Sequence, residues 1–232
     1  MIKVFTINLS FSTLYLIEDD GKYLVVDAGI PGKTRLLKRK LAQLNINPQD
    51  ISLIILSHVH YDHVGNVNWL KEESNAPVMV HMDEGNYLER GLRLIPNGAT
   101  ISGKILSNLG KLYNPLPKFV PVKPDILVSD ILSLRDFGFS ATVIPTPGHT
   151  SGSISIVFGS GESFVGDTCF SLYGSKNVFP IFANDIPSLL KSWQTLIDSE
   201  ANIIFPGHGK PISKDELVKS YMEKKAVSTY II

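Results

Sequence analysis

Short apolar runs separated by turn residues make up most of the chain, and this pattern indicates β-strands. The runs are rich in Val, Ile, Leu and Phe, which fit the half-buried surface of a pleated sheet. Asp19-Asp20-Gly21-Lys22 joins two of them and has the composition of a hairpin turn. The predicted strands are residues 2–8, 13–18, 23–26, 51–56, 78–81, 126–128, 131–134, 140–146, 153–158, 162–165 and 202–205.

Apolar residues at helical spacing predict helices between these strands. A helix that begins near residue 33 or 34 places Leu36, Leu37, Leu41 and Leu44 on one face. The other predicted helices are residues 67–71, residues 187–199 with Pro187 in the first turn, and a final helix opened by the capping box Ser213-Lys214-Asp215-Glu216.

Residues 83–123 form the least regular part of the pattern. Their apolar positions predict two short helices with a Gly/Pro break, followed by an extended stretch through several prolines. A connection this long inside a compact domain is usually functional or held down by a partner. We interpret it as a helical lid over a substrate pocket, with ordinary packing or a homodimer contact as the alternative.

The composition is that of one soluble globular domain spanning residues 1–232. With 44% hydrophobic residues the chain can bury a substantial core. The 22 basic and 22 acidic residues cancel, so neither nucleic acid nor a membrane is expected as a partner, although a local basic patch is compatible with this balance. A single cysteine excludes an intramolecular disulfide, and with no signal-peptide pattern or long apolar run we expect a cytoplasmic protein.

The stretch from Ser57 to Asn66 carries the strongest chemical signal. His58 and His60 follow a buried strand, and their alternation there points both imidazoles the same way. Asp62 and His63 come next, at a turn, where their side chains can aim at a second point. This arrangement suits two metal ions.

Three further candidates lie far away in the chain, each after an apolar run. His149 and His208 sit in Pro-Gly-His turns, and Asp167 follows Gly166. A lone H-x-H is usually structural, but seven potential ligands at strand ends are hard to obtain by accident. His81 lacks the Gly-His context and is interpreted as structural, and Cys169 as a buried apolar residue in preference to a soft ligand.

These motifs, H-x-H-x-D-H, a distal His, Gly-Asp and Gly-His-Gly, resemble in full and in order the signature of the metallo-β-lactamase fold superfamily. The resemblance spans residues 27–209 and implies a four-layer αββα sandwich with metals at one edge. It assigns one metal to His58, His60 and His149, the other to Asp62, His63 and His208, and a bridging role to Asp167. The Asp27-Ala28-Gly29 turn resembles a loop that supports the site from outside.

The resemblance also implies the chemistry. Two divalent ions about 3.5 to 4 Å apart would activate a bridging hydroxide for attack on a carbonyl or phosphoryl centre. Zinc is the default, while iron or manganese also suit imidazole and carboxylate ligands. Asp62 would position the second metal and shuttle a proton, which makes it the catalytic candidate.

The expected substrate is a small ester, thioester or lactone in a largely apolar pocket. Hydroxyacylglutathione hydrolases share the ligand set, but this chain ends soon after its final helix, so glutathione thioesters are not expected. In acylhomoserine lactone lactonases a tyrosine follows the bridging Asp by three residues, where this chain has Phe170. Tyr173 is the candidate replacement, with aromatic packing as its alternative, and Tyr87 is expected at the pocket. A phosphodiesterase and a mono-iron oxidoreductase resembling persulfide dioxygenases are the alternative functions.

Overall fold

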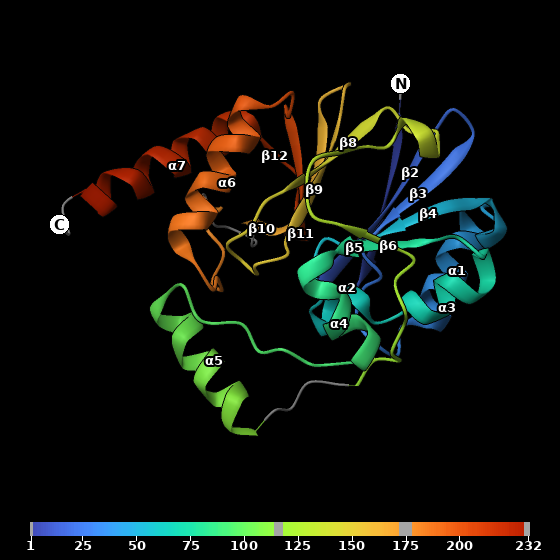
Figure 1. The fold of residues 1–232 in the computed structure, drawn as a ribbon, viewed down its shortest axis with the longest axis horizontal. Helices are drawn as coiled ribbons and strands as arrows, with labels where there is room; N and C mark the ends of the chain where they lie inside the picture. Colours follow the sequence, from blue (N-terminus) through green and yellow to red (C-terminus); the bar gives the residue numbers. More distant parts are fainter. Residues whose placement is uncertain (1, 114–117, 172–177, 230–232) are drawn as a thin grey trace.

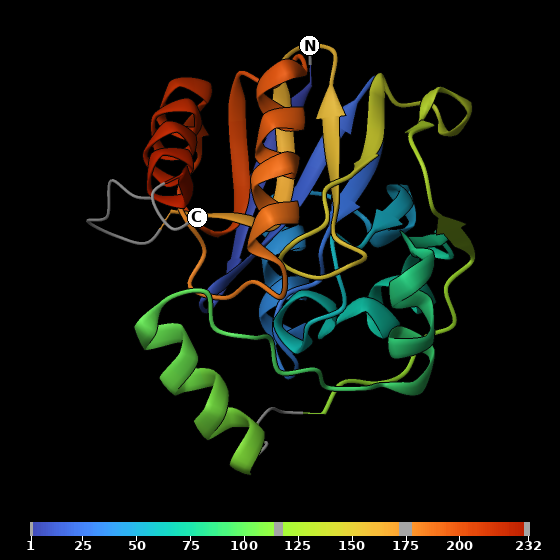
Figure 2. The same ribbon diagram turned by 60° about the vertical axis from the view of Figure 1, so that its left-hand side comes forward.

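Two mixed β-sheets lie face to face, and helices cover the outer face of each (Figures 1 and 2). The computed structural model describes residues 2–113, 118–171 and 178–229. Each sheet has six strands, in the order β1-β2-β3-β4-β5-β6 and β12-β11-β10-β9-β8-β7. The architecture is the expected four-layer αββα sandwich. The first sheet contains β1 (Lys3–Leu9), β2 (Ser12–Asp19), β3 (Lys22–Val26), β4 (Ile51–Ile55), β5 (Val78–His81) and β6 (Ile126–Val128).

The first sheet is buried on both faces. β1 to β3 pair antiparallel through tight turns, whereas β3, β4, β5 and β6 run parallel. Successive residues of β4 point to opposite faces, so Leu53 and Ile55 pack between the sheets while Ile54 packs under the helices. The covering helices are α1 (Thr34–Gln43) and α3 (Val67–Ser74). Because parallel strands end at one edge, the loops after β3, β4 and β5 meet there.

The second sheet contains β7 (Leu132–Ser133), β8 (Ala141–Pro145), β9 (Ile154–Phe158), β10 (Glu162–Ser171), β11 (Ile203–Gly209) and β12 (Ile212–Ser213). Its outer face is covered by α6 (Ile186–Asp198) and α7 (Lys214–Thr229), whose core contacts include Trp193 and Leu217. The predicted capping box is confirmed, since Ser213 N–H donates to Glu216 Oε2 at 2.8 Å and Glu216 N–H donates to Ser213 Oγ at 3.3 Å.

Most predicted strands and helices are confirmed with shifts of one or two residues at their ends. The loop position predicted for two of the candidate ligands was wrong. Asp167 and His208 were expected after strands and instead lie inside β10 and β11. These two strands keep pairing in parallel beyond the glycines, where Phe170 faces His208. Gly166 absorbs the irregularity with a φ of +50°, so the strand bends and continues. The expected turn at Asp62 is in fact the short helix α2 (Tyr61–Val64).

Two helices follow β5, as predicted for residues 83–123. They are α4 (Met82–Arg90) and α5 (Ile101–Tyr113). In Figures 1 and 2 α5 stands apart from both sheets, beside the edge where the strands of the first sheet end. Short 3₁₀ turns at η1 (Pro48–Asp50) and η2 (Arg135–Phe137) were not predicted. In the described part of the chain no helix combines the length and hydropathy needed to cross a membrane.

Candidate metal centre

All seven predicted ligands converge at one edge of the sandwich, although they come from four separate segments. The loop after β4 carries His58 and His60, and α2 carries Asp62 and His63. The others come from the second sheet, with His149 in the turn after β8, Asp167 in β10 and His208 in β11. Their ligand atoms form two groups, His58, His60, His149 and Asp167 in the first and Asp62, His63 and His208 in the second, within 4.8 Å inside each group.

The first group has the spacing of ligands around one cation. His60 Nδ1 lies 2.9 Å from His58 Nε2 and 3.0 Å from His149 Nε2, and His149 Nε2 lies 3.4 Å from Asp167 Oδ2. Tetrahedral zinc with bonds near 2.0–2.1 Å places its ligand atoms about 3.3 Å apart. All four residues are buried. The set therefore fits a divalent metal ion.

The second group repeats this geometry. His63 Nε2 and His208 Nε2 are 3.3 Å apart, and Asp62 Oδ2 lies 3.3 Å from His208 Nε2. Asp62 Oδ2 also lies 3.8 Å from His63 Nε2. These three atoms surround a second point and suit a second cation.

Asp167 links the two groups through its two carboxylate oxygens. Oδ2 faces the first group, whereas Oδ1 lies 3.2 Å from His63 Nε2 and 3.4 Å from His208 Nε2. Oδ1 is buried and has no hydrogen-bond partner, which is costly unless a cation compensates it. Gly207 permits this approach, because a Cβ there would lie 2.5 Å from His63 Cε1 and 2.6 Å from Asp167 Oδ1. The carboxylate therefore has the placement of a bridging ligand.

Four of the five imidazoles are oriented by a hydrogen bond on the nitrogen that faces away from the metal points. His58 Nδ1 pairs with Ser57 Oγ at 3.0 Å, and His63 Nδ1 donates to Asp27 Oδ2 at 2.8 Å. Two main-chain carbonyls complete the set. The carbonyl of Phe182 accepts from His149 Nδ1 at 3.0 Å, and that of Phe11 accepts from His208 Nδ1 at 2.7 Å. Such partners fix the tautomer and the ring orientation of a metal-binding histidine.

Asp27 joins the turn after β3 to the ligand loop. Besides His63, it accepts from Ser57 N–H at 2.8 Å and from Ser57 Oγ at 2.9 Å. Its φ is +63°, a left-handed conformation that Asp and Asn adopt more easily than most residues. The support predicted for this turn is thus a direct hydrogen-bonded contact.

Glu84 braces the first group from the other side, and the sequence pattern did not reveal it. This buried carboxylate of α4 accepts from Val59 N–H at 2.9 Å, between the two ligands of that loop. Thr150 and Gly152, which follow His149, lie beside the same carboxylate. A Cβ at Gly152 would overlap the Glu84 side chain. In the sequence Glu84 is an ordinary acidic residue in the first turn of a predicted helix, so nothing in its pattern distinguishes it.

The pKa values of the histidines in the first group are lowered, which favours binding of a cation. Burial, and then the neighbouring imidazoles, lower the pKa of His58, and burial followed by His149 lowers the pKa of His60 to about 3. Burial also lowers the pKa of His149. These rings are therefore neutral at pH 7, the state that binds a metal.

In the second group the pKa values of the histidines are raised instead. Burial acts to lower the pKa of His63 and His208, but the carboxylates, Asp167 first, outweigh it and raise that of His208 to about 10. Despite burial, the pKa of Asp167 is held well below its usual range by His208 and His63. The carboxylates thus attract positive charge, which a cation would supply in place of protons.

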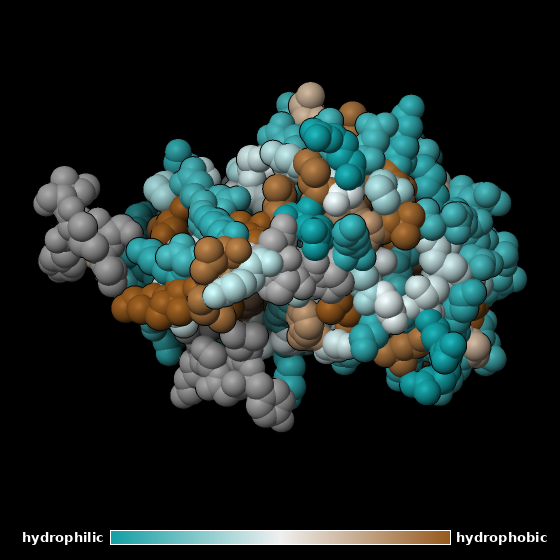
Figure 3. All heavy atoms as spheres, turned by 90° about the horizontal axis from the view of Figure 1, so that it is seen from below, coloured by the Kyte–Doolittle hydropathy of each residue, from teal (hydrophilic) through white to brown (hydrophobic). Residues whose placement is uncertain are grey.

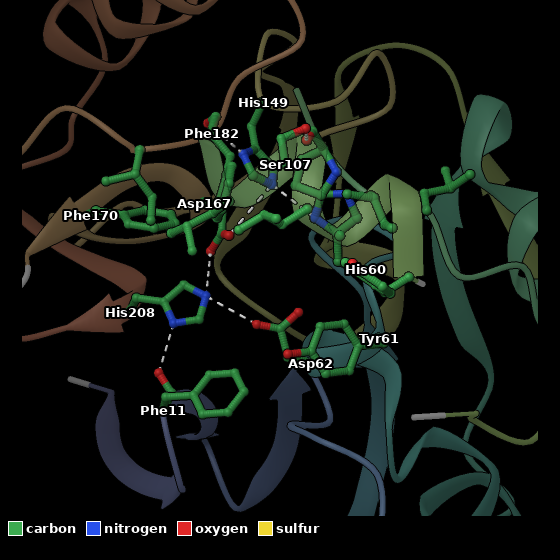
Figure 4. A pocket seen from close by; sticks show the side chains of 18 residues that line it. Phe11, His60, Tyr61, Asp62, Ser107, His149, Asp167, Phe170, Phe182 and His208 are labelled. Atoms are coloured by element: carbon green, nitrogen blue, oxygen red, sulfur yellow. Dashed lines mark hydrogen bonds and ion pairs between the residues drawn. The ribbon is translucent and has the colours of Figure 1, made fainter. Parts of the chain in front are cut away.

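A cavity of about 630 Å³ opens onto this centre. His60, Asp62, His149, Asp167 and His208 lie at its floor, where Figure 4 shows them pointing toward one another. Most of the wall is apolar, and the described residues that line it include neither lysine nor arginine. The apolar wall residues are Phe11, Leu94, Ile95, Pro96, Leu106, Leu109, Phe170, Ile181 and Phe182, with Tyr61 and Tyr113 beside them.

The predicted substrate residues fare differently. Phe170 lines the cavity and its ring centroid lies 4.8 Å from that of His208. The prediction that Tyr87 lies at the pocket was wrong, because its side chain packs against the core under the first sheet and is absent from the described cavity lining. Tyr173 lies outside the described residues.

Two residues interpreted as structural lie outside both ligand groups. His81 accepts from Asp83 N–H at 3.2 Å and so caps α4. Cys169 is fully buried in the core beneath α6, on the face of β10 away from the centre.

Comparisons with known proteins show which family and fold the chain is similar to. A family model described as the metallo-beta-lactamase superfamily matches residues 7–208. A "probable metallo-hydrolase" of Methanocaldococcus jannaschii is 32% identical over 194 residues, covering 82% of this chain and 84% of that protein. A metallo-beta-lactamase structure from Cronobacter sakazakii has a TM-score of 0.69 at 20% identity, covering 98% of this chain and 90% of that one. A metallo-beta-lactamase family protein of Thermus thermophilus also gives 0.69, at 22% identity, covering 99% and 79%.

Proposed function

The chain belongs to the metallo-beta-lactamase superfamily, and from this premise we propose that it is a binuclear zinc hydrolase that cleaves a small ester, thioester or lactone. One observation carries the proposal: two groups of buried ligand atoms share the carboxylate of Asp167. The relative named a probable metallo-hydrolase supports the reaction class.

The residues around the centre have separable roles in this proposal. Bound divalent cations supply an activated water and a Lewis acid for the group under attack. Asp62 lies at the cavity floor 3.3 Å from His208 Nε2, so its carboxylate would hold the second cation and accept a proton beside the reacting carbon. Asp27 and the carbonyls of Phe11 and Phe182 hold the imidazoles in the orientation that the reaction needs.

The cavity favours an uncharged acyl substrate over a phosphodiester. An anionic substrate would find no lysine or arginine among the described lining residues, whereas an apolar chain would meet the Leu, Ile and Phe wall. Tyr61 offers a hydroxyl on this wall, and burial followed by Asp62 raises its pKa to about 12, so it remains a hydrogen-bond donor at neutral pH. It can orient a carbonyl where Phe170 cannot.

Metal content and bond preference test the proposal together. Protein purified without added metal should carry two zinc ions per chain, and it should turn over nitrophenyl acetate or a lactone faster than bis-nitrophenyl phosphate. A single iron with oxygen uptake would instead identify an oxidoreductase. Dominant phosphodiester turnover would overturn the assignment to acyl substrates.

Ligand variants test the mechanism. His58→Ala and Asp167→Ala should each reduce turnover by roughly a thousandfold or more, because electrostatic activation by the cations supplies several kcal/mol of the rate enhancement. His81→Ala is the matched control, since this buried histidine lies outside both groups and should leave the metal content unchanged. Full activity in both ligand variants would refute a metal-centred reaction.

A further inference from the structure

Helix α5 is docked on the protein through its smallest residues. Gly103 and Ser107 are its buried positions, and Ser107 Oγ donates to the Pro96 carbonyl at 2.6 Å. A Cβ at Gly103 would overlap the carbonyl oxygen of Ile181, and one at Gly110 would lie 3.2 Å from Ile95 Cγ2. The helix therefore approaches the cavity wall closely on this side.

Three large apolar residues of α5 point outward, away from the cavity. Ile101, Ile105 and Leu112 are 82%, 58% and 72% exposed. Their spacing places them on one helical face, which we call the outer face of α5. Seen from below in Figure 3, hydrophobic atoms form a continuous band where this helix lies. A surface helix of a soluble domain normally has the reverse arrangement, and large exposed apolar patches mark interaction sites.

The segment that carries this face has charges of one sign only. Residues 91–123 contain five basic residues and no acidic one, although the 22 basic and 22 acidic residues of the whole chain balance. They are Arg93, Lys104, Lys111, Lys118 and Lys123. Lys104 and Lys111 are both exposed and, being seven residues apart, lie on the same side of α5 beside its outer face. An apolar face flanked by lysines is the pattern of a helix that lies in the plane of a lipid interface.

We propose that the outer face of α5 docks on the surface of an anionic phospholipid membrane. A second copy of the chain fits the face less well, because a two-fold contact would bring the same basic segments together with no acidic residue from residues 91–123 to oppose them. The zero net charge suggested no membrane partner, but this local imbalance is what an anionic surface attracts.

The position of α5 connects this surface to the cavity. Leu106, Leu109 and Tyr113 line the cavity from the same helix whose outer face is exposed. A lipophilic ester could therefore pass from the interface into the cavity, a consequence that rests on the proposed function. Docking itself is independent of the reaction.

Vesicle sedimentation of the full chain tests the proposal. We expect binding to phosphatidylcholine vesicles that contain phosphatidylserine, weaker binding to phosphatidylcholine alone, and a decline with added salt because exposed charges are screened. Ile101→Ser, Ile105→Ser and Leu112→Ser combined should reduce binding by roughly tenfold or more, since they remove the inserted apolar area. Lys104→Glu with Lys111→Glu should have an effect of about the same size.

Matched controls separate docking from folding and from catalysis. Ile131→Ser changes an equally exposed residue elsewhere, and Arg39→Glu with Lys219→Glu reverses two exposed charges on α1 and α7, so neither should alter vesicle binding. Retained metal content and retained nitrophenyl acetate turnover show that a variant is folded. The proposal is overturned if the wild type ignores anionic vesicles at low salt or if the triple variant still binds them. It is also overturned if the wild type is a dimer that the triple variant converts to monomer, because a second copy then covers the face.

Discussion

The metal centre and helix α5 bound the same cavity, yet they are built in opposite ways. At the centre, buried side chains are fixed by a second set of contacts, as His63 is by Asp27. Helix α5 is buried at Gly103 and Ser107, leaves Ile101, Ile105 and Leu112 exposed, and contributes other apolar side chains to the cavity wall. One region is buried and polar, and the other is apolar and largely exposed.

This difference separates chemistry from substrate selection. Reacting groups have to be held to within fractions of an ångström, which requires dense outer contacts. A wall that accommodates an apolar chain needs shape and area more than fixed polar geometry. Substitutions at the centre should therefore affect metal content and turnover for every substrate, while substitutions at α5 should distinguish substrates by size.

The largest of these effects is expected for Asp27→Asn. Asparagine keeps the shape and tolerates the left-handed φ, but its amide group cannot accept all the hydrogen bonds that Ser57 and His63 now donate. Loss of such an outer partner typically costs about 10- to 100-fold in metal affinity or activity. Competition with a chromophoric chelator measures the affinity, and Asp136→Asn, on an exposed turn, is the control. An unchanged affinity would mean that the imidazole of His63 is positioned by packing alone.

A smaller, substrate-dependent effect is expected for Gly103→Ala. The new methyl group would overlap the Ile181 carbonyl and push α5 away from the cavity. KM for a nitrophenyl ester with a long acyl chain should rise several-fold, in line with about 1–3 kcal/mol for an apolar pocket contact. Turnover of nitrophenyl acetate and metal content should stay the same. Gly159→Ala is the matched control, because its Cβ meets only ordinary contacts.

If Gly103→Ala also lowered the metal content, the position of α5 would affect the metal centre. The proposed separation between chemistry at the centre and substrate selection at α5 would then be wrong. Kinetics with two chain lengths, measured on protein of known metal content, decide this.

The sequence predicted the metal centre more fully than the cavity wall. His58, His60, Asp62 and His63 are adjacent in the chain, and the end of a parallel strand fixes where they lie. The distal residues follow apolar runs, so their placement at the same edge could be anticipated even though Asp167 and His208 proved to be inside strands. Local patterns were sufficient because each ligand lies in or directly after an apolar strand segment that leads to this edge.

The wall could not be predicted in this way. Which face of α5 points inward depends on close contacts with Pro96 and Ile181, which are distant in the sequence or lie in an irregular segment. Apolar spacing suggested a lid with its apolar face at the pocket and a pocket role for Tyr87. In the structure Leu106 and Leu109 do line the cavity, but the buried positions of α5 are small residues and Tyr87 packs against the first core. The main-chain carbonyl of Phe11, which accepts a hydrogen bond from His208, could not be predicted either, because any residue type has such a carbonyl.

A subtler test concerns Glu84, which braces the centre from α4. Burial raises its pKa and outweighs the hydrogen bonds from Thr150, Val59 and Gly152. A carboxyl whose folded pKa is raised contributes stability below its unfolded pKa, near 4.5, that is lost as the pH rises through the folded value. Glu84→Gln cannot titrate, so the stability of the variant relative to the wild type should increase from pH 4 toward pH 7.

Urea unfolding at several pH values measures this difference, with both proteins carrying the same metal content. Glu89→Gln, exposed on the same helix, should show no such trend. A difference that is constant with pH would show that burial does not shift the pKa of Glu84, and a difference that decreases toward pH 7 would show that folding favours the carboxylate.

The smallest effect is expected for Cys169, which tests whether nearness in sequence to Asp167 matters. The thiol is fully buried beneath α6, close to Trp193, and burial raises its pKa, so almost no thiolate forms at pH 8. Cys169→Ala should leave metal content and turnover unchanged and lower the free energy of unfolding by about 1 kcal/mol, the usual cost of a small buried deletion. The native thiol should react with Ellman's reagent only after unfolding in urea. Loss of metal in the alanine variant would place the sulfur at the centre, because the two faces of β10 would then not be separate environments.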